Sequence, residues 1–118
     1  MQLSGSRLAV SLQRSGKLVR VETLSVTAGT ALGIGDANGD GRPDIYVVQG
    51  GMGSNADDRL LLNNGDGRGF RSVVIPQTHL GNGDDVVVLD HDRNGLDDFL
   101  VLNGAQRPGP VQLIAGFR

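Results

Sequence analysis

Two short segments combine acidic, amide and glycine residues in a spacing that suits a metal ion. The first loop, residues 36–44, reads DANGDGRPD, and the second loop, residues 90–98, reads DHDRNGLDD. Each has oxygen-bearing side chains at positions 1, 3, 5 and 9, and a glycine at position 6 that permits a sharp turn. Position 7 is placed to offer its backbone carbonyl. The candidate ligands are Asp36, Asn38, Asp40, Arg42 (carbonyl) and Asp44 in the first loop, and Asp90, Asp92, Asn94, Leu96 (carbonyl) and Asp98 in the second.

This oxygen-rich set favours calcium over the other common metals. Calcium takes about six to eight oxygen ligands and accepts a flexible loop of carboxylates and carbonyls, whereas magnesium demands stricter octahedral geometry. Zinc prefers nitrogen and sulfur ligands, and no His or Cys stands at a ligand position. We therefore expect two Ca2+ sites, one in each loop.

Two other interpretations compete with a calcium loop that closes at position 9. An EF-hand loop begins in the same way but carries a bidentate Glu at position 12, where this chain has Val47 and Val101. A lone loop rich in Asp, Asn and Gly is often only a turn. The second copy, 54 residues further along (90 − 36), keeps the four side-chain oxygens and the glycine, which favours metal binding over a plain turn.

The elements that position these loops are predicted to be short strands. Apolar, β-branched runs bounded by Gly, Asn and Asp favour strands, and residues 86–89 (VVVL) are an example. No segment shows a convincing helical pattern. The expected strands cover residues 8–12, 18–23, 31–35, 45–49, 60–62, 70–75, 86–89, 99–102 and 111–114.

An internal repeat organises these strands. Residues 31–50 align with residues 86–104, and a weaker match relates residues 7–24 to residues 59–76. A unit of about four strands in roughly fifty residues matches one β-propeller blade. We predict an all-β chain of about two four-stranded blades, either a fragment of a propeller or blades shared between chains. The expected division of the single unit 1–118 is a half blade at 1–30, a full blade at 31–76 and a second, incomplete blade at 77–118.

Composition argues against several partners and chemistries. The net charge is −2 without a basic stripe, which speaks against nucleic acid. No apolar run is long enough for membrane insertion, and the N-terminus lacks the apolar core of a signal peptide. With no Cys and no Ser–His–acid pattern, nucleophilic catalysis has no clear candidates. We expect Asp57 and Asp58 to be solvated edge residues or neighbours of a calcium site, and His91 to be a solvated surface residue.

The residues around the loops resemble the FG-GAP/VCBS repeat family, whose repeats form the blades of integrin-α-like propellers. The resemblance lies in GDANGDGRPDIYVV followed by RLLLNNGDGRGF, and in LDHDRNGLDDFLVLNG followed by PVQLIAGF. More narrowly, the run is similar to repeats of the ASPIC/UnbV, cartilage-acidic-protein-like group. The second hairpin lacks the Asn-Gly-Asp-Gly turn, and a full propeller of this family needs several more blades. The resemblance implies calcium at the candidate ligands and an extracellular or cell-surface setting.

Three functions from different classes are consistent with this pattern. The first is a calcium-binding repeat module, with structural calcium, that serves cell adhesion or the recognition of a protein or glycan. The second is part of a propeller enzyme, a lyase or hydrolase with calcium near its active site. Because Lys17 is the only Lys and neither His is a ligand, we expect no enzyme. The third is a blade fragment that assembles into a homo-oligomeric propeller through exposed strand edges.

Overall fold

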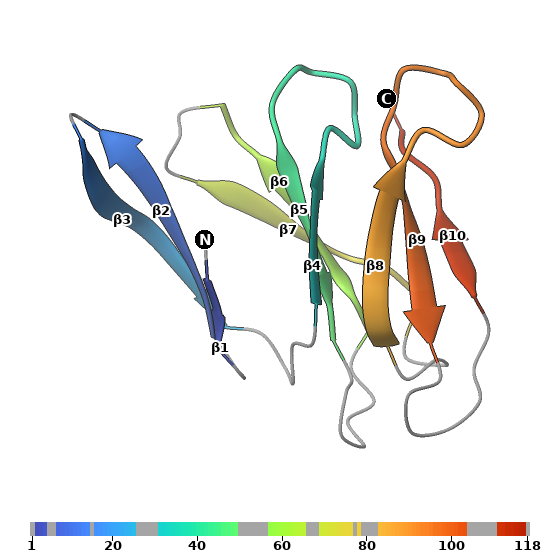
Figure 1. The fold of residues 1–118 in the computed structure, drawn as a ribbon, viewed down its shortest axis with the longest axis horizontal. Helices are drawn as coiled ribbons and strands as arrows, with labels where there is room; N and C mark the ends of the chain where they lie inside the picture. Colours follow the sequence, from blue (N-terminus) through green and yellow to red (C-terminus); the bar gives the residue numbers. More distant parts are fainter. Residues whose placement is uncertain are drawn as a thin grey trace.

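Three antiparallel β-sheets make up the described part of the chain in the computed structural model (Figure 1). The structure describes residues 2–4, 7–14, 16–25, 31–49, 57–65, 69–76, 78, 83–103 and 111–117. The N-terminal sheet contains β1 (Gln2–Ser4), β2 (Arg7–Arg14) and β3 (Lys17–Ser25). The central sheet contains β4 (Ala31–Gly35), β5 (Asp44–Val48), β6 (Arg59–Asn63) and β7 (Phe70–Val74). The C-terminal sheet contains β8 (Gly83–Leu89), β9 (Asp98–Asn103) and β10 (Gln112–Ile114).

The predicted all-β fold class is confirmed. All nine expected strands coincide with strands of the structure, and the residues that the structure describes form no α-helix. β1 is an additional strand that the sequence pattern did not indicate. Within the described residues, no helix is long and apolar enough to span a bilayer.

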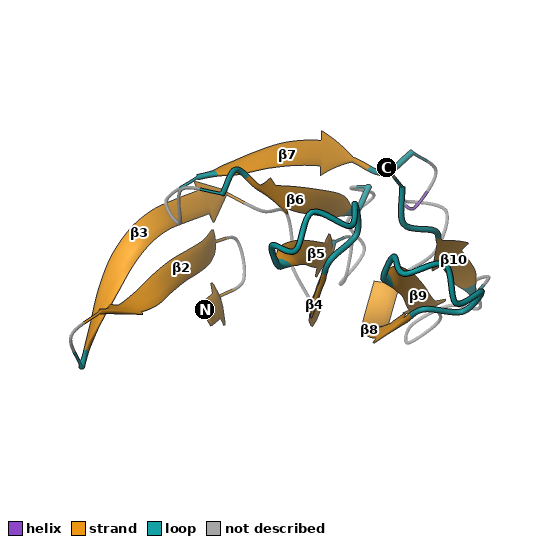
Figure 2. Ribbon diagram, turned by 90° about the horizontal axis from the view of Figure 1, so that it is seen from above, coloured by secondary structure: helices purple, strands orange, loops and turns teal. Residues whose placement is uncertain are grey.

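Each sheet is a meander in which strands that follow one another along the chain also pair with one another. β4 pairs with β5, β5 with β6 and β6 with β7, all antiparallel. In the C-terminal sheet, β8 pairs with β9 and β9 with β10 in the same way. Seen from above, the sheets stand side by side, and β4 and β8 lie close together along one side of the row (Figure 2). This arrangement resembles successive blades of a propeller.

The core described by the structure lies between the central and C-terminal sheets. Tyr46 of β5 stacks on Phe99 of β9, with the ring centroids 4.9 Å apart. Gly33 of β4 faces β8, and a Cβ added to it would come within 3.0 Å of the Val88 side chain. The absence of a side chain at Gly33 therefore lets the two inner strands approach closely. The buried cluster consists of Ala37, Tyr46, Val48, Leu60, Leu62, Val86, Phe99 and Val101.

A buried acid links two strands of the central sheet. Asp58, only 1% exposed, accepts hydrogen bonds from the Tyr46 hydroxyl at 2.8 Å and from the Gln49 N–H at 2.9 Å. Its own N–H donates to Thr78 Oγ1 at 2.6 Å. Burial raises the pKa of Asp58 to about 6, although the bonds from Gln49 and Tyr46 act to lower it. The expectation that Asp58 is solvated or beside a calcium site is therefore wrong, because its carboxylate satisfies donors inside the core.

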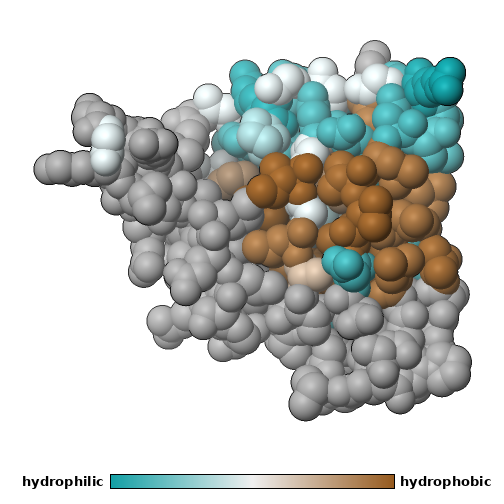
Figure 3. All heavy atoms as spheres, viewed as in Figure 1, coloured by the Kyte–Doolittle hydropathy of each residue, from teal (hydrophilic) through white to brown (hydrophobic). Residues whose placement is uncertain are grey.

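Polar and apolar residues separate along the height of the sheets. Figure 3 shows hydrophilic side chains gathered at the top, where the connections after β4 and β8 lie, and hydrophobic side chains below them. The apolar part of the strands thus forms a base that holds the polar connections at one end.

Candidate metal-binding loops

The two predicted calcium loops occupy the same place in neighbouring sheets. The first loop connects β4 to β5 in the central sheet, and the second connects β8 to β9 in the C-terminal sheet. Both lie at the same end of the molecule (Figure 1). Because each loop joins two antiparallel strands that pair, its first and last positions are held close together.

The aspartate at position 1 organises each loop from within. Asp36 accepts hydrogen bonds from the N–H groups of Gly39 at 2.9 Å and Asp40 at 3.2 Å on Oδ1, and of Gly41 at 2.9 Å on Oδ2. Asp90 repeats this pattern, since it accepts from Asn94 at 3.1 Å and from the position-6 glycine, Gly95, at 2.9 Å. Both carboxylates therefore point into their loops rather than into solvent.

The backbone takes the same path through the two loops. Positions 4 and 6 have positive φ in both, at 73° and 81° for Gly39 and Gly41 and at 59° and 85° for Arg93 and Gly95. Arg93 is the only non-glycine with positive φ among the described residues. A left-handed conformation costs an L-residue about 1–2 kcal/mol. The second loop keeps its shape despite this cost, which indicates that its hydrogen bonds determine the path.

Short side chains at positions 3 and 5 continue the inward-facing pattern. Asn38 Oδ1 accepts from the Asp40 N–H at 3.3 Å, and Asp40 Oδ1 accepts from the Arg42 N–H at 2.9 Å. In the second loop, Asn94 Oδ1 accepts from the Leu96 N–H at 3.0 Å. These bonds turn the Asn38 and Asp40 oxygens of the first loop, and the Asn94 oxygen of the second, toward backbone N–H groups of their own loops.

Position 9 is the anchor of each loop. Asp44 and Asp98 are fully buried. Asp44 accepts from the N–H of Ala37 at 2.9 Å and, across the sheet, from that of Asn63 at 2.9 Å. Asp98 accepts from the N–H of His91 at 3.0 Å and from that of Gly116 at 2.6 Å. Each aspartate thus ties the start of its loop to the chain near the third strand of its sheet.

The two buried aspartates differ in their electrostatics. Burial raises the pKa of Asp44, and the neighbouring carboxylates of Asp40 and Asp36 raise it further, against the hydrogen bonds from Asn63 and Ala37. Burial acts in the same direction on Asp98, but hydrogen bonds from Gly116 and His91 outweigh it and lower its pKa. In the first loop, burial and the neighbouring carboxylates therefore both disfavour the ionised form of Asp44.

The two position-7 residues, Arg42 and Leu96, have side chains in different environments. The side chain of Arg42 turns back over the neighbouring hairpin, where a Cβ added to Gly65 would meet its guanidinium at 2.6 Å. Arg42 Nη1 also lies 3.6 Å from Asp40 Oδ2 in an exposed ion pair. Leu96 instead is buried, at 5% exposure. The side chain at this position is therefore exposed and ion-paired in the first loop and buried in the second, and the role of its carbonyl as a ligand stays a prediction.

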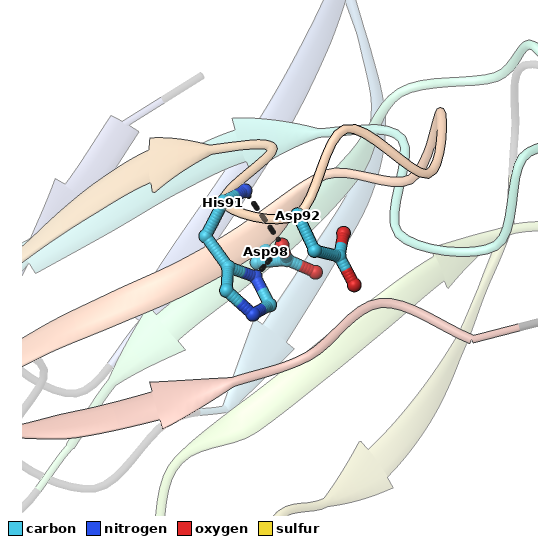
Figure 4. A group of neighbouring side chains, drawn as sticks. All are labelled: His91, Asp92 and Asp98. Carbon is cyan, nitrogen blue, oxygen red and sulfur yellow. Dashed lines mark hydrogen bonds and ion pairs between the residues drawn. The ribbon is translucent and has the colours of Figure 1, made fainter.

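His91 does not point away from its loop. Its Nδ1 contacts Asp98 Oδ2, and this contact raises the pKa of the imidazole (Figure 4). His91, Asp92 and Asp98 form the one group of three histidine or acidic side chains, among the described residues, whose ligand atoms lie within 4.8 Å of one another. The expectation of a solvated His91 is therefore wrong in part, because the exposed ring still engages the buried aspartate. The three carboxylates of the first loop do not meet this spacing in the structure.

The loops also touch each other, which the sequence did not indicate. The Asp36 N–H donates to Asp97 Oδ2 at 2.7 Å, and the Asp97 N–H donates to the Asp36 carbonyl at 3.0 Å. The Phe117 N–H donates to the Ala37 carbonyl at 2.7 Å. The equivalent of Asp97 in the first loop is Pro43. This difference at position 8 was the one sequence feature that could have pointed to the contact between the loops. It could not be interpreted without knowing how the two sheets pack.

The donor set of the loops fits a hard divalent cation. All the candidate side-chain ligands carry oxygen, and the carboxylates at positions 1 and 9 are fixed by backbone N–H groups rather than by cationic side chains, His91 excepted. Residues 66–68 of the hairpin whose sequence resembles the FG-GAP pattern lie outside the described residues.

The chain is similar to one known family of repeats. The family model described as FG-GAP-like repeat matches residues 36–101, a span that contains both loops and more than half of the 118 residues. No curated protein and no solved structure matches the chain. The all-β meander sheets, the repeated acidic loop and this match agree with one another, and the chain belongs to the FG-GAP-like repeat family.

Proposed function

We propose that this chain is a calcium-binding repeat module in which calcium stabilises the fold and the exposed surface recognises a protein or glycan outside the cell. The observation that carries the proposal is the common hydrogen-bonding pattern of the two loops. In both, the position-1 carboxylate accepts from the position-6 N–H, and the buried position-9 carboxylate accepts from the position-2 N–H. The same pattern in two sequences that differ at most other positions supports the proposal of a shared ligand.

Calcium, when bound, would supply a compact double charge that neutralises the loop carboxylates. Asp36, Asn38, Asp40, the Arg42 carbonyl and Asp44 would hold it in the first loop. Asp90, Asp92, Asn94, the Leu96 carbonyl and Asp98 would hold it in the second. We give the ion no catalytic role, because each loop offers a nearly complete oxygen set from the protein itself. Adhesion or recognition is the role that such a rigidified module would serve.

Thermal unfolding in millimolar calcium and in excess EDTA tests this proposal. A ligand that binds only the folded state stabilises it by about 2.7 kcal/mol at a hundredfold excess over its Kd. We expect Tm to rise in calcium. Asp40→Ala and Asp92→Ala should each remove part of the rise, whereas the matched control Asp85→Ala, an exposed acid of β8 outside both loops, should not. Identical melts in calcium and EDTA would overturn the proposal.

A second candidate function, assembly with another copy of the chain, is favoured by one face of the C-terminal sheet. In the central sheet, the cross-strand row Gly33–Tyr46–Leu60 faces the C-terminal sheet. The corresponding row of the C-terminal sheet is Val87–Leu100–Leu113. Val87 is 45% and Leu113 43% exposed, and Leu102 on the same face is 36% exposed. The C-terminal sheet thus repeats the docking face of the central sheet, and Val87, Leu102 and Leu113 on this face are exposed.

We propose that a sheet of a second copy covers this face, because an apolar surface that continues an existing packing pattern is a docking surface rather than scattered exposure. Sedimentation velocity over a range of concentrations tests the idea. We expect self-association that Leu113→Asp weakens, while the equivalent change at an exposed polar site, Ser72→Asp, leaves it intact. A monomer at every concentration would reject this second function and leave the calcium proposal untouched.

A further inference from the structure

We propose that the two loops bind their cations cooperatively, with Asp97 as the positioning residue that couples them. This inference rests on the proposed calcium function. It goes beyond that function because it concerns how one site alters the affinity of the other.

Reciprocal hydrogen bonds between Asp36 and Asp97 form the coupling. Asp36 is the position-1 ligand candidate of the first loop, and its N–H donates to Asp97 Oδ2 at 2.7 Å. The Asp97 N–H returns a bond to the Asp36 carbonyl at 3.0 Å. Asp97 is not a ligand candidate, but it stands between two of them, Leu96 and Asp98. Any restraint on the Asp36 backbone therefore acts directly on the backbone that presents positions 7 and 9 of the second loop.

Close packing leaves Asp97 little freedom to take another position. A Cβ added to Gly35 would lie 2.8 Å from Asp97 Oδ2 and 3.0 Å from Asp97 Cβ. The Asp97 side chain thus fills the space that the glycine leaves open immediately before Asp36. Because the contact is tight on this side and hydrogen-bonded on the other, movement of one loop is transmitted to the other rather than absorbed.

The segment after β10 makes a second link between the loops. The Gly116 N–H donates to Asp98 Oδ1 at 2.6 Å, and the next N–H, from Phe117, donates to the Ala37 carbonyl at 2.7 Å. The Ala37 N–H in turn donates to Asp44 Oδ2 at 2.9 Å. One short segment therefore joins the position-9 aspartate of the second loop to the residue that contacts the position-9 aspartate of the first.

Because of these links, the two loops share the conformational entropy that is lost when they become ordered. A cation that orders one loop must restrict its backbone, and that restriction reduces what remains to be ordered in the other. Coupling of this kind between two sites typically changes affinity by about 5- to 150-fold and is reciprocal. We expect a value near the lower end, about fivefold to tenfold, because two short contacts rather than a whole interface carry it.

Amide resonances of Gly41 and Gly95 report the two loops separately. Each N–H donates at 2.9 Å to the position-1 carboxylate of its own loop, so a cation on that carboxylate will shift the resonance. Calcium is titrated into the full-length chain and followed by 15N–1H correlation spectra. The decisive measurement is the Kd read from Gly95 in the native chain, in Asp40→Ala, in Asp97→Ala, and in the double variant.

Cooperativity predicts that Asp40→Ala, which disables the first loop, weakens calcium binding at Gly95 about fivefold to tenfold. In the Asp97→Ala background, the same change should have a much smaller effect. Asp97→Asn serves as the conservative variant, because it removes the charge but keeps an oxygen that accepts from the Asp36 N–H, and it should preserve coupling. Where Asp40→Ala fails to fold, Asp40→Asn takes its place, because it removes the charge of one ligand but keeps an oxygen that accepts from the Arg42 N–H.

The outcomes distinguish this inference from the function on which it rests. If neither glycine resonance responds to calcium, the calcium function itself fails. If both respond but the Gly95 Kd is the same with and without an intact first loop, the calcium function stands and the coupling is rejected. If coupling is present but unchanged in Asp97→Ala, the assignment of Asp97 as the positioning residue is wrong.

Discussion

The Tyr46 ring lies on the Phe99 ring with an interplanar angle of 24°, and this stack joins β5 of the central sheet to β9 of the C-terminal sheet. Both side chains are almost fully buried. The Tyr46 hydroxyl continues outward from the stack to Asp58, so the same residue serves the packing between sheets and the polar network inside one sheet. The two loops are held side by side by strands whose contact depends on this pair.

Removal of the Phe99 ring should destabilise the protein strongly. We expect Phe99→Ala to cost roughly 3–5 kcal/mol, because truncation of a buried phenylalanine leaves a cavity that neighbours fill only in part. Phe99→Leu, which keeps most of the volume, should cost much less. Urea unfolding followed by circular dichroism measures both. A loss below about 1 kcal/mol for Phe99→Ala would show that the two sheets do not depend on each other.

Stability should depend on pH through Asp58. Its folded-state pKa of about 6 lies above the usual 3.8, so the folded protein holds this proton more tightly than the unfolded chain. The corresponding stabilisation is complete below about pH 4 and is lost as the pH rises through about 6. Asp58→Asn cannot ionise and keeps an oxygen for the Gln49 N–H. Between pH 4 and pH 7, the free energy of unfolding of Asp58→Asn should rise relative to that of the native chain by on the order of 3 kcal/mol. This figure corresponds to the rise of about two units in the pKa of Asp58.

Urea unfolding of the native chain and of Asp58→Asn at pH 4 and pH 7 gives this difference. Asp85→Asn is the matched control, because it makes the same charge change at an exposed residue of β8, whereas Asp57 is one cause of the raised pKa of Asp58. A difference in stability between native and Asp58→Asn that is the same at both pH values would contradict the assignment.

At position 6 of the first loop, the cost of a side chain should depend on how readily the new residue adopts a positive φ. Gly41 has φ of +81° and nothing within 4 Å of an added Cβ, so a substitution there meets strain without a clash. We expect Gly41→Ala to lower the free energy of unfolding by about 1–2 kcal/mol, since L-residues resist this conformation. Gly41→Asn should cost less, because Asn adopts left-handed backbone more readily. Equal effects of Ala and Asn, measured by thermal unfolding, would argue against a backbone origin.

Gly116 should be intolerant of a side chain for a different reason. An added Cβ would lie 2.6 Å from the Asp97 carbonyl oxygen and 2.7 Å from that of Ala37, and backbone atoms cannot yield as a flexible side chain does. Gly116→Ala should therefore displace the segment after β10 and cost about 1–3 kcal/mol. Amide hydrogen exchange at Phe117 should become faster, because its bond to Ala37 would be lost. Ala115→Ser, at the exposed neighbour, is the control, and unchanged protection at Phe117 in Gly116→Ala would contradict the prediction.

Sequence patterns located most of the fold because each strand is indicated by its own residues and by the turn residues that flank it. The apolar stretch of β5 is an example: it is short, and it lies between an acidic loop and a glycine-rich segment, which together favour a strand. β1 was missed because residues 2–4 contain one apolar side chain, and their strand conformation depends on pairing with β2. The loops were predicted from their residue types, their spacing and the second copy, and the structure places them at equivalent positions in neighbouring sheets.

Contacts between different strands and loops could not be predicted from the sequence. The bonds between Asp36 and Asp97 arise from the stacking of two sheets, which no local pattern specifies. Asp58 follows Asp57 in a polar stretch that suggested solvent, yet the register of β5 with β6 brings it within hydrogen-bond distance of the Tyr46 hydroxyl. His91 was assigned to the surface by its loop position, and its ring remains exposed, but it turns back onto Asp98.

The segment that carries Gly116 and Phe117 also determines how the molecule would yield to force. A pull on the C-terminal end would reach the bonds from these residues to Asp98 and Ala37 before it reached the ladder between β10 and β9. The second of the two links between the loops would part while the sheets were still intact. Tension at this end would therefore detach the C-terminal segment from both loops first and leave the bonds between Asp36 and Asp97 as the remaining link.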